Sequence, residues 1–360
     1  MSTSAPSTPI LRALGLPVIG APMAGGPSTP ALAAAVNRAG GLGFLAAGYL
    51  TPDRLDEDIA ATRRLTDRPF GVNVFVAGDG SAEPGPIAAY AARLDPLADR
   101  AGVTLGRPLH DDDGFADKVA LVRKRDIPLV SFTFGAPPQD VIDALHAGGA
   151  EVWLTVTSPA EARVAAAMGA DALIVQGVEA GGHRGVFADD ADQSDLTLLA
   201  ALALVRAAVA LPLVAAGSIT TGAALGAVLV AGAAAGQVGT AYLRSAEAGT
   251  SDAQRAATAG DAPTVLTRAF SGRTARGITN RWHQEHGAGA PQAYPEVHHL
   301  TAPLRAHGRR VGDPDLINLW AGQTHQLAQG RSAVQITRDL ADGARVAIES
   351  AWDRLGNRDR

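Results

Sequence analysis

The sequence predicts an α/β fold, a (β/α)₈ TIM barrel with a smaller, mostly helical second lobe. The first observation is that eight short apolar runs alternate with alanine-rich, helix-like stretches over about 230 residues, the length typical of such a barrel. The second is that apolar residues follow one another within each run, as in parallel strands covered on both faces. The third is that this alternation stops near residue 264.

The expected strands are short and end in small or polar residues. They occupy residues 18–22, 42–45, 71–75, 129–132, 151–155, 172–175, 213–216 and 236–239. An open, doubly wound sheet is the alternative fold. It usually carries a glycine-rich turn after its first strand, and residues 21–26 match that pattern poorly.

Helix boundaries fit between these strands. Thr29, Thr51 and Ser158 each precede a proline, which pairs a good N-cap with the residue best suited to the first helical position. Two similar phrases, residues 147–151 and 167–171, contain glycines that stop a helix just before a new strand. The helices and strands therefore alternate as a barrel requires.

We divide the chain into three parts. Residues 1–9 are rich in Ser, Thr and Pro and are expected to form a flexible tail. Residues 10–263 form the barrel, and residues 264–360 a helical lobe packed on its substrate side. Within that lobe, we expect one helix to begin at Asp313 and Pro314 and a last helix to span residues 333–355.

Composition narrows the function. The formal net charge is −5, which argues against a nucleic-acid or anionic-membrane partner. No cysteine is present, so disulfides and thiolate chemistry are excluded. Neither a secretory signal nor an uninterrupted apolar span is seen, and no carboxylate or histidine cluster has metal-binding spacing, so we expect a cytoplasmic protein without a metal.

The run from residue 176 to 185, Gln-Gly-Val-Glu-Ala-Gly-Gly-His-Arg-Gly, follows directly on an expected strand. Working groups of these barrels lie at the carboxyl ends of the strands. The glycines would let a ligand approach the backbone, and His183 could act on it near neutral pH. The simpler interpretation of His183 is a solvated loop residue.

Few other strand ends carry ionisable groups. Lys118 and Lys124 fall in a helical stretch, which excludes a Schiff-base lysine at a strand end. A barrel this poor in charge suggests that a bound cofactor supplies the chemistry. Residues 214–222 and 237–240 fit a phosphate site after the seventh and eighth strands. An ordinary tight turn is the alternative.

Together these segments resemble the nitronate monooxygenases, specifically their bacterial class I branch, from about residue 17 to residue 340. The motifs are residues 19–26, 39–49, Asn73, 176–185, 215–218 and 237–240. The resemblance implies an FMN-binding barrel that oxidises alkyl nitronates with O₂ by single-electron transfer to the flavin. Propionate 3-nitronate would be the favoured substrate, and detoxification of nitro compounds the biological role.

The resemblance also implies roles for individual residues. The flavin contacts would be Met23, Ala24, Asn73, Gln176, Gly181, Gly182, Gly217, Ser218, Gln237, Val238, Gly239 and Thr240. His183 would face the substrate, either as a base for a neutral nitroalkane or, as we favour, to position and stabilise a nitronate. Further substrate candidates are Thr133, Arg268, Arg276 and Tyr294. Some members have a histidine in the segment of Thr133, so the substrate range can differ. The arginines could instead form a solvated cluster at a helix start.

Three other functions stay open. An FMN- and NAD(P)H-dependent enoyl-thioester reductase would need the same flavin site. A barrel for a sugar phosphate would bind no flavin, and a flavin-binding protein for sensing or storage would bind it without turnover. For the favoured function the partners are a small anionic nitronate and O₂, with a homodimer as the candidate assembly.

Overall fold

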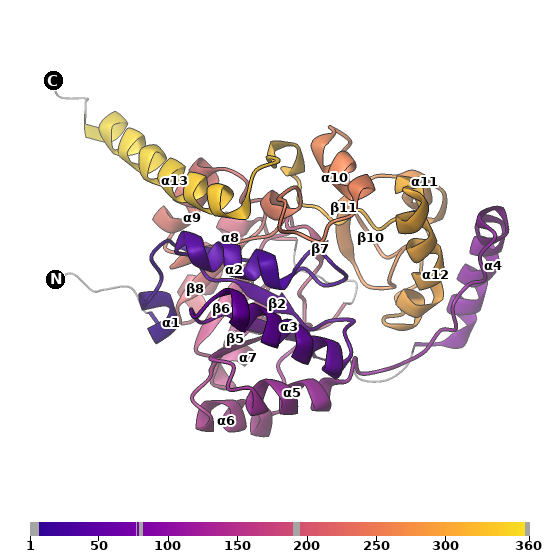
Figure 1. Cartoon of the computed structure of the whole chain (residues 1–360), viewed down its shortest axis with the longest axis horizontal. Helices are drawn as coiled ribbons and strands as arrows, with labels where there is room; N and C mark the ends of the chain where they lie inside the picture. The colour runs from indigo at the N-terminus through magenta and orange to yellow at the C-terminus, as the bar shows by residue number, and fades with distance from the viewer. Residues whose placement is uncertain (1–6, 77, 79–81, 190–194, 357–360) are drawn as a thin grey trace.

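The computed structural model describes residues 7–76, 78, 82–189 and 195–356. At its centre lies a sheet of eight parallel strands in the order β1-β9-β8-β6-β5-β4-β3-β2. The strands are β1 (Val18–Gly20), β2 (Phe44–Ala46), β3 (Gly71–Phe75), β4 (Leu129–Thr133), β5 (Glu151–Val156), β6 (Ala172–Gln176), β8 (Leu213–Ala216) and β9 (Ala235–Val238). A parallel bridge between Ile19 and Leu42 nearly closes the sheet between β1 and β2. The predicted barrel is confirmed (Figure 1).

Helices surround the strands, and their starts follow the expected caps. The hydroxyls of Thr29, Thr51 and Ser158 accept hydrogen bonds from the backbone N–H three residues on. The helices are α1 (Pro9–Arg12), α2 (Pro30–Ala39), α3 (Pro52–Leu65), α5 (Phe115–Lys124), α6 (Gln139–Ala147), α7 (Pro159–Ala167), α8 (Leu198–Ala208), α9 (Gly222–Val230) and α10 (Asp252–Ala259), with a 3₁₀ turn η1 (Thr240–Tyr242).

The second lobe contains both helices and a small sheet. Its helices are α4 (Pro84–Ala101), α11 (Arg281–His286) and α12 (Glu296–Val311). The three-stranded sheet has the order β10-β11-β7, formed by β10 (Thr264–Thr267), β11 (Ala275–Ile278) and β7 (Gly182–His183). The lobe therefore contains a small sheet beside its helices. It also includes α4, which leaves the barrel between β3 and α5 and packs beside α12 (Figure 1).

The prediction of a helix that begins at Asp313 and Pro314 is wrong. Only a 3₁₀ turn, η2 (Pro314–Leu316), forms there, and a second one, η3 (His325–Leu327), follows. Ile317 is extended, and Trp320 forms an antiparallel bridge to Gly277, so this segment runs along β11 instead of coiling. The apolar residues that suggested a helix pack against the lobe's sheet and core.

The last helix, α13 (Ala333–Gly356), matches the prediction but packs on the barrel, against α9 and α2. A Cβ on Gly222 would lie 2.4 Å from Gly343 Cα, so this glycine pair brings α9 and α13 into backbone contact. Among the described residues, no helix is both long and apolar enough to cross a membrane.

Candidate active site

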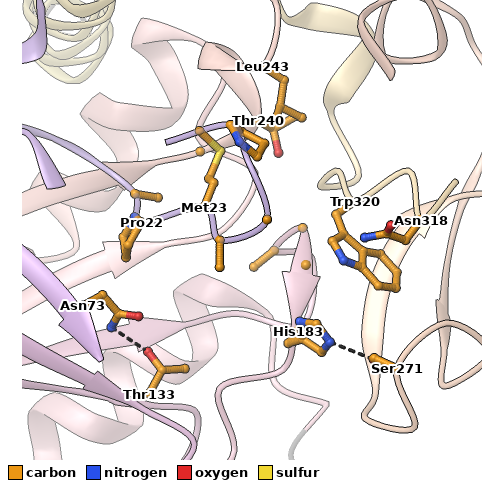
Figure 2. Close-up of a pocket in the computed structure, with 18 of the residues that line it drawn as sticks. Pro22, Met23, Asn73, Thr133, His183, Thr240, Leu243, Ser271, Asn318 and Trp320 are labelled. Atoms are coloured by element: carbon orange, nitrogen blue, oxygen red, sulfur yellow. Dashed lines mark hydrogen bonds between the residues drawn. The ribbon is translucent and has the colours of Figure 1, made fainter. Parts of the chain in front are cut away.

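A cavity of about 450 Å³ lies at the carboxyl ends of the barrel strands. The barrel forms its floor, and α12 together with residues 318–320 forms its wall on the lobe side. Most of the predicted site residues meet here. Those lining the cavity are Met23, Ala24, Asn73, Thr133, Gln176, Gly181, Gly182, His183, Gly217, Ser218, Gln237, Gly239 and Thr240. Figure 2 labels Met23, Asn73, Thr133, His183 and Thr240 among them.

The Gln176 side chain shapes the loop that follows β6. Its Nε2 donates to the His183 carbonyl oxygen at 3.0 Å, and its Oε1 accepts from Gly185 N at 2.8 Å and from the Arg184 guanidinium at 3.0 Å. The loop therefore folds back, and Gly182 and His183 pair with β11 of the second lobe. One N–H of the Gln176 amide keeps no partner within the described ranges and lines the cavity.

His183 is held by the second lobe. Its Nε2 lies 2.8 Å from Ser271 Oγ, and the Ser271 hydroxyl in turn donates to the Arg273 carbonyl oxygen at 3.3 Å (Figure 2). Because a hydroxyl has one proton to donate, Ser271 Oγ is the acceptor for Nε2–H, and the lone pair of Nδ1 is left free. Burial, with the nearby charge of Arg273, lowers the pKa of His183 to about 3. His183 is accordingly neutral at physiological pH.

Gly181 and Gly182 serve different purposes. A Cβ on Gly181 would lie 2.5 Å from the backbone of Ala321 and Gly322, so this glycine lets the lobe segment pack against the loop. Gly182 has φ +76°, and its missing side chain would meet no atom within 4 Å. Of these two glycines, Gly182 is the one that leaves open space along the cavity wall.

The ends of β8 and β9 present backbone and hydroxyl groups. Gly217 and Ser218 have φ of 145° and 48°, which turns the chain sharply after β8. The Ser218 hydroxyl donates to the Glu179 carbonyl oxygen at 2.9 Å, so it has no proton left for a ligand. The Thr240 hydroxyl accepts from Gly322 N at 3.0 Å and retains its proton. An anion here would be bound by Thr240 and backbone N–H groups.

Two amide oxygens of residues that line the cavity have no hydrogen-bond donor among the described residues. The Asn73 Nδ2 donates to Ser131 and to Thr133 Oγ1, at 3.0 Å each, and leaves Oδ1 without a partner in the part of the chain that the structure describes. Gln237 Oε1 is buried and likewise has no hydrogen-bond partner among the described residues. A buried acceptor without a donor is costly, so these oxygens favour a ligand that carries N–H or O–H groups.

Four predicted site residues do not line the cavity. Val238 packs in the apolar layer between the barrel strands and the surrounding helices. Arg268 pairs with Asp189 at 3.1 Å, and the Arg276 guanidinium donates to the Val178 carbonyl oxygen at 3.0 Å. Tyr294 stands behind the wall, with its ring 5.9 Å from that of His183. Arg268 and Arg276 therefore stabilise the segment after β6 through these contacts. They do not form the solvated cluster at a helix start that was the alternative.

One face of α12 lines the cavity although none of its residues was predicted to belong to the site. His298, Ala302, Arg305, Ala306 and Arg309 all line the cavity. Their spacing of three and four residues places them on one side of a helix, a pattern that is visible in the sequence. The glycines, prolines and histidines of residues 287–299 are typical of a loop, but α12 already begins at Glu296. Asn318 and Trp320 complete this wall.

Within the described residues, no three His, Cys, Asp or Glu side chains are grouped so that they could bind a metal. The profile of the nitronate monooxygenases matches residues 9–343. The chain belongs to the nitronate monooxygenase family. Membership assigns it to the oxidoreductases, as the motifs predicted.

Individual relatives agree with this assignment. A nitronate monooxygenase of Pseudomonas aeruginosa is 40% identical over 345 residues, which cover 93% of this chain and 98% of that protein. A probable nitronate monooxygenase of Staphylococcus aureus is 36% identical over 334 residues, 90% of this chain and 93% of that one. Both comparisons span barrel and lobe together.

Solved structures show the same fold. A nitroalkane oxidase from Streptomyces ansochromogenes is 46% identical, with a TM-score of 0.93 over 96% of this chain and 100% of that one. FabK from Thermotoga maritima is 26% identical, with a TM-score of 0.76 over 96% of this chain and 97% of that one. The nitroalkane oxidase is therefore the nearer of these two.

Proposed function

We propose that the protein oxidises alkyl nitronates with O₂ by means of bound FMN, and that propionate 3-nitronate represents its substrate class. The observation that carries the proposal is a single cavity that combines unpartnered amide acceptors, an anion site at the ends of β8 and β9, and a neutral histidine. Family membership supports the oxidation of a nitronate.

The residues fit FMN. Asn73 Oδ1 and Gln237 Oε1 can accept hydrogen bonds from the flavin and its ribityl chain, and the free N–H of Gln176 can donate to a ring carbonyl. Met23 and Ala24 supply apolar surface at one side of the cavity. The turn at Gly217 and the start of η1 at Thr240 would bind the phosphate through backbone N–H groups and the Thr240 hydroxyl.

When bound, FMN would accept electrons from the nitronate and pass them to O₂. The chain's own task is to bind and orient the substrate. His183 would not have to remove a proton, because a nitronate is already deprotonated. A pKa of about 3 makes His183 a weak base, so a nitronate suits the cavity better than a neutral nitroalkane. This assigns the stabilisation of the anion to other groups.

Arginines provide that stabilisation. Arg305 and Arg309 of α12 line the cavity, and neither forms an ion pair with a carboxylate in the described part of the chain. Burial lowers the pKa of Arg305 to about 10, which leaves it charged at neutral pH. An unpaired buried cation favours an anionic ligand, and propionate 3-nitronate carries two negative charges.

The purified protein should contain FMN that is released by denaturation, and it should convert propionate 3-nitronate in the presence of O₂. A protein that purifies colourless and gains no visible absorption on incubation with FMN would refute the cofactor assignment. In that case a barrel for a sugar phosphate would become the better interpretation.

The FMN- and NAD(P)H-dependent reductase needs a separate test, because it would use the same flavin site. Under anaerobic conditions, a reductase would oxidise NADPH on addition of an enoyl thioester, whereas we expect no NADPH consumption. A yellow protein that is inactive with both NADPH and nitronate would instead indicate a flavin-binding protein without turnover.

A further inference from the structure

Helix α12 presents a second histidine to the cavity. His298 lies on the same face as Arg305 and Arg309, and the small residues Ala302 and Ala306 leave space in front of them. Some family members have a second histidine in the segment of Thr133, but this chain has no histidine in that segment. The cavity of this chain therefore has two histidines, His183 from the segment after β6 and His298 from α12.

Arg305 determines which nitrogen of His298 carries the proton. Its NH2 group donates to the His298 carbonyl oxygen at 2.7 Å and lies 3.3 Å from His298 Nδ1. A guanidinium can only donate, so Nδ1 must be the acceptor and the ring proton must sit on Nε2. Thr301 Oγ1 accepts from Arg305 Nε at 3.0 Å and fixes the guanidinium in turn.

The ring of His298 is also fixed in its plane. It stacks on Tyr49, with 4.0 Å between ring centroids and 10° between planes. The Tyr49 backbone N–H donates to Asp113 Oδ1 at 3.0 Å, and Lys118 Nζ lies 2.7 Å from Asp113 Oδ2. Within the described ranges, Nε2 has no partner in the protein, so its N–H is available to a ligand in the cavity.

The start of α12 is tied to a strap formed by residues 102–114. Gly106 N donates to the Leu300 carbonyl oxygen at 2.9 Å, and a Cβ on Gly106 would lie 2.1 Å from the His299 carbonyl oxygen. His299 pairs with Asp111 on the outer side of the helix, at 2.8 Å. The backbone that carries His298 is therefore held from behind.

We propose that His298 donates its Nε2–H to an anionic oxygen of the substrate, and that Arg305, besides supplying positive charge to the cavity, keeps the proton on Nε2. This inference rests on the proposed function, because it takes the nitronate as the anion. It divides the work between the histidines. His183 presents the lone pair of Nδ1 and the surface of its ring to the cavity, and His298 presents the Nε2–H donor.

Two substitutions separate the donor from the ring. His298→Phe keeps a ring to stack on Tyr49 but removes the N–H, whereas His298→Gln keeps an N–H donor near the position of Nε2. We expect His298→Phe to raise KM for propionate 3-nitronate by about tenfold to a hundredfold, the range for a hydrogen bond to a charged group, with a smaller change in kcat. His298→Gln should restore most of the loss. His307→Gln is the matched control, because His307 lies in the same helix, contacts Arg310 and does not line the cavity, and it should leave KM unchanged.

The protonation itself can be observed without turnover. In ¹⁵N-histidine NMR spectra of the FMN-loaded protein, His298 should show the neutral Nε2–H form. A neutral Nδ1–H form, or equal KM values for His298→Phe and the wild type, would overturn the inference. A wild-type protein that does not oxidise the nitronate would instead refute the proposed function, and the two failures are thereby distinguished.

Discussion

His183 Nε2 and Ser271 Oγ lie 2.8 Å apart, although 88 positions separate the two residues in the chain. The bond joins the loop after β6 to the second lobe, directly beside the β7–β11 pair. It makes the orientation of the proposed site histidine depend on how the lobe docks on the barrel. The site is therefore built from both parts of the chain.

Ser271 should consequently act through His183. Replacing Ser271 with Ala removes one neutral hydrogen bond, and we expect kcat/KM for propionate 3-nitronate to fall about fivefold, equivalent to about 1 kcal/mol. Ser271→Thr retains the hydroxyl and should stay near the wild type. A loss in Ser271→Thr as large as in Ser271→Ala would show that the hydroxyl is not what matters.

His183→Asn should reduce nitronate turnover at least about tenfold while FMN remains bound, because the ring forms the wall beside Trp320 and Phe134. The absorbance ratio of flavin to protein measures cofactor retention, and steady-state O₂ uptake measures turnover. His146→Asn, an exposed histidine paired with Asp171, is the control. Equal rates for His183→Asn and His146→Asn would reduce His183 to a loop residue.

Stability should depend on pH through His183. Its pKa is about 3 in the folded protein, against an ordinary value of 6.5, so the unfolded chain binds the extra proton. The free energy of unfolding is then greatest above pH 6.5 and falls as the pH drops toward 3, by at most about 1.4 kcal/mol per pH unit. Denaturant titrations at pH 6.5 and 5.0 should show a smaller difference for His183→Gln than for the wild type.

Gly181→Ala should disturb the docking of the lobe. The added methyl group would lie 2.5 Å from backbone atoms of Ala321 and Gly322, which cannot move aside cheaply. We expect a loss of about 1–3 kcal/mol in unfolding free energy, measured by denaturant titration. Gly85→Ala is the matched control, because no atom lies within 4 Å of its Cβ, and its effect should stay within about 0.5 kcal/mol.

The barrel could be predicted from the sequence because its signals are local. Thr29 and Ser158 cap helices with their own hydroxyls, and the apolar runs such as residues 172–175 are buried strands. The same local signals located most of the cavity, since the carboxyl ends of parallel strands meet at one end of a barrel. Asn73, Gln176 and Thr240 were found in this way.

The remaining features depend on contacts that are distant in the chain. Arg276 looked like a free cation, but its partner is the Val178 carbonyl oxygen, 98 positions away. The segment after Asp313 was expected to be helical, yet its Trp320 pairs with Gly277 of β11. His298 lies in a segment of loop-like composition, and only the docking of α12 brings it to the cavity. Side-chain hydrogen bonds also redirected Ser218, whose hydroxyl donates to Glu179 instead of facing a ligand.

The most direct test of the account is O₂ uptake by the FMN-loaded protein. It is recorded with propionate 3-nitronate, with 3-nitropropionate at a pH where the carbon that bears the nitro group keeps its proton, and with NADPH. We predict rapid uptake with the nitronate, much slower uptake with the nitroalkane because His183 is a weak base, and none with NADPH. Uptake that requires NADPH, or a rate with the nitroalkane equal to that with the nitronate, would contradict it.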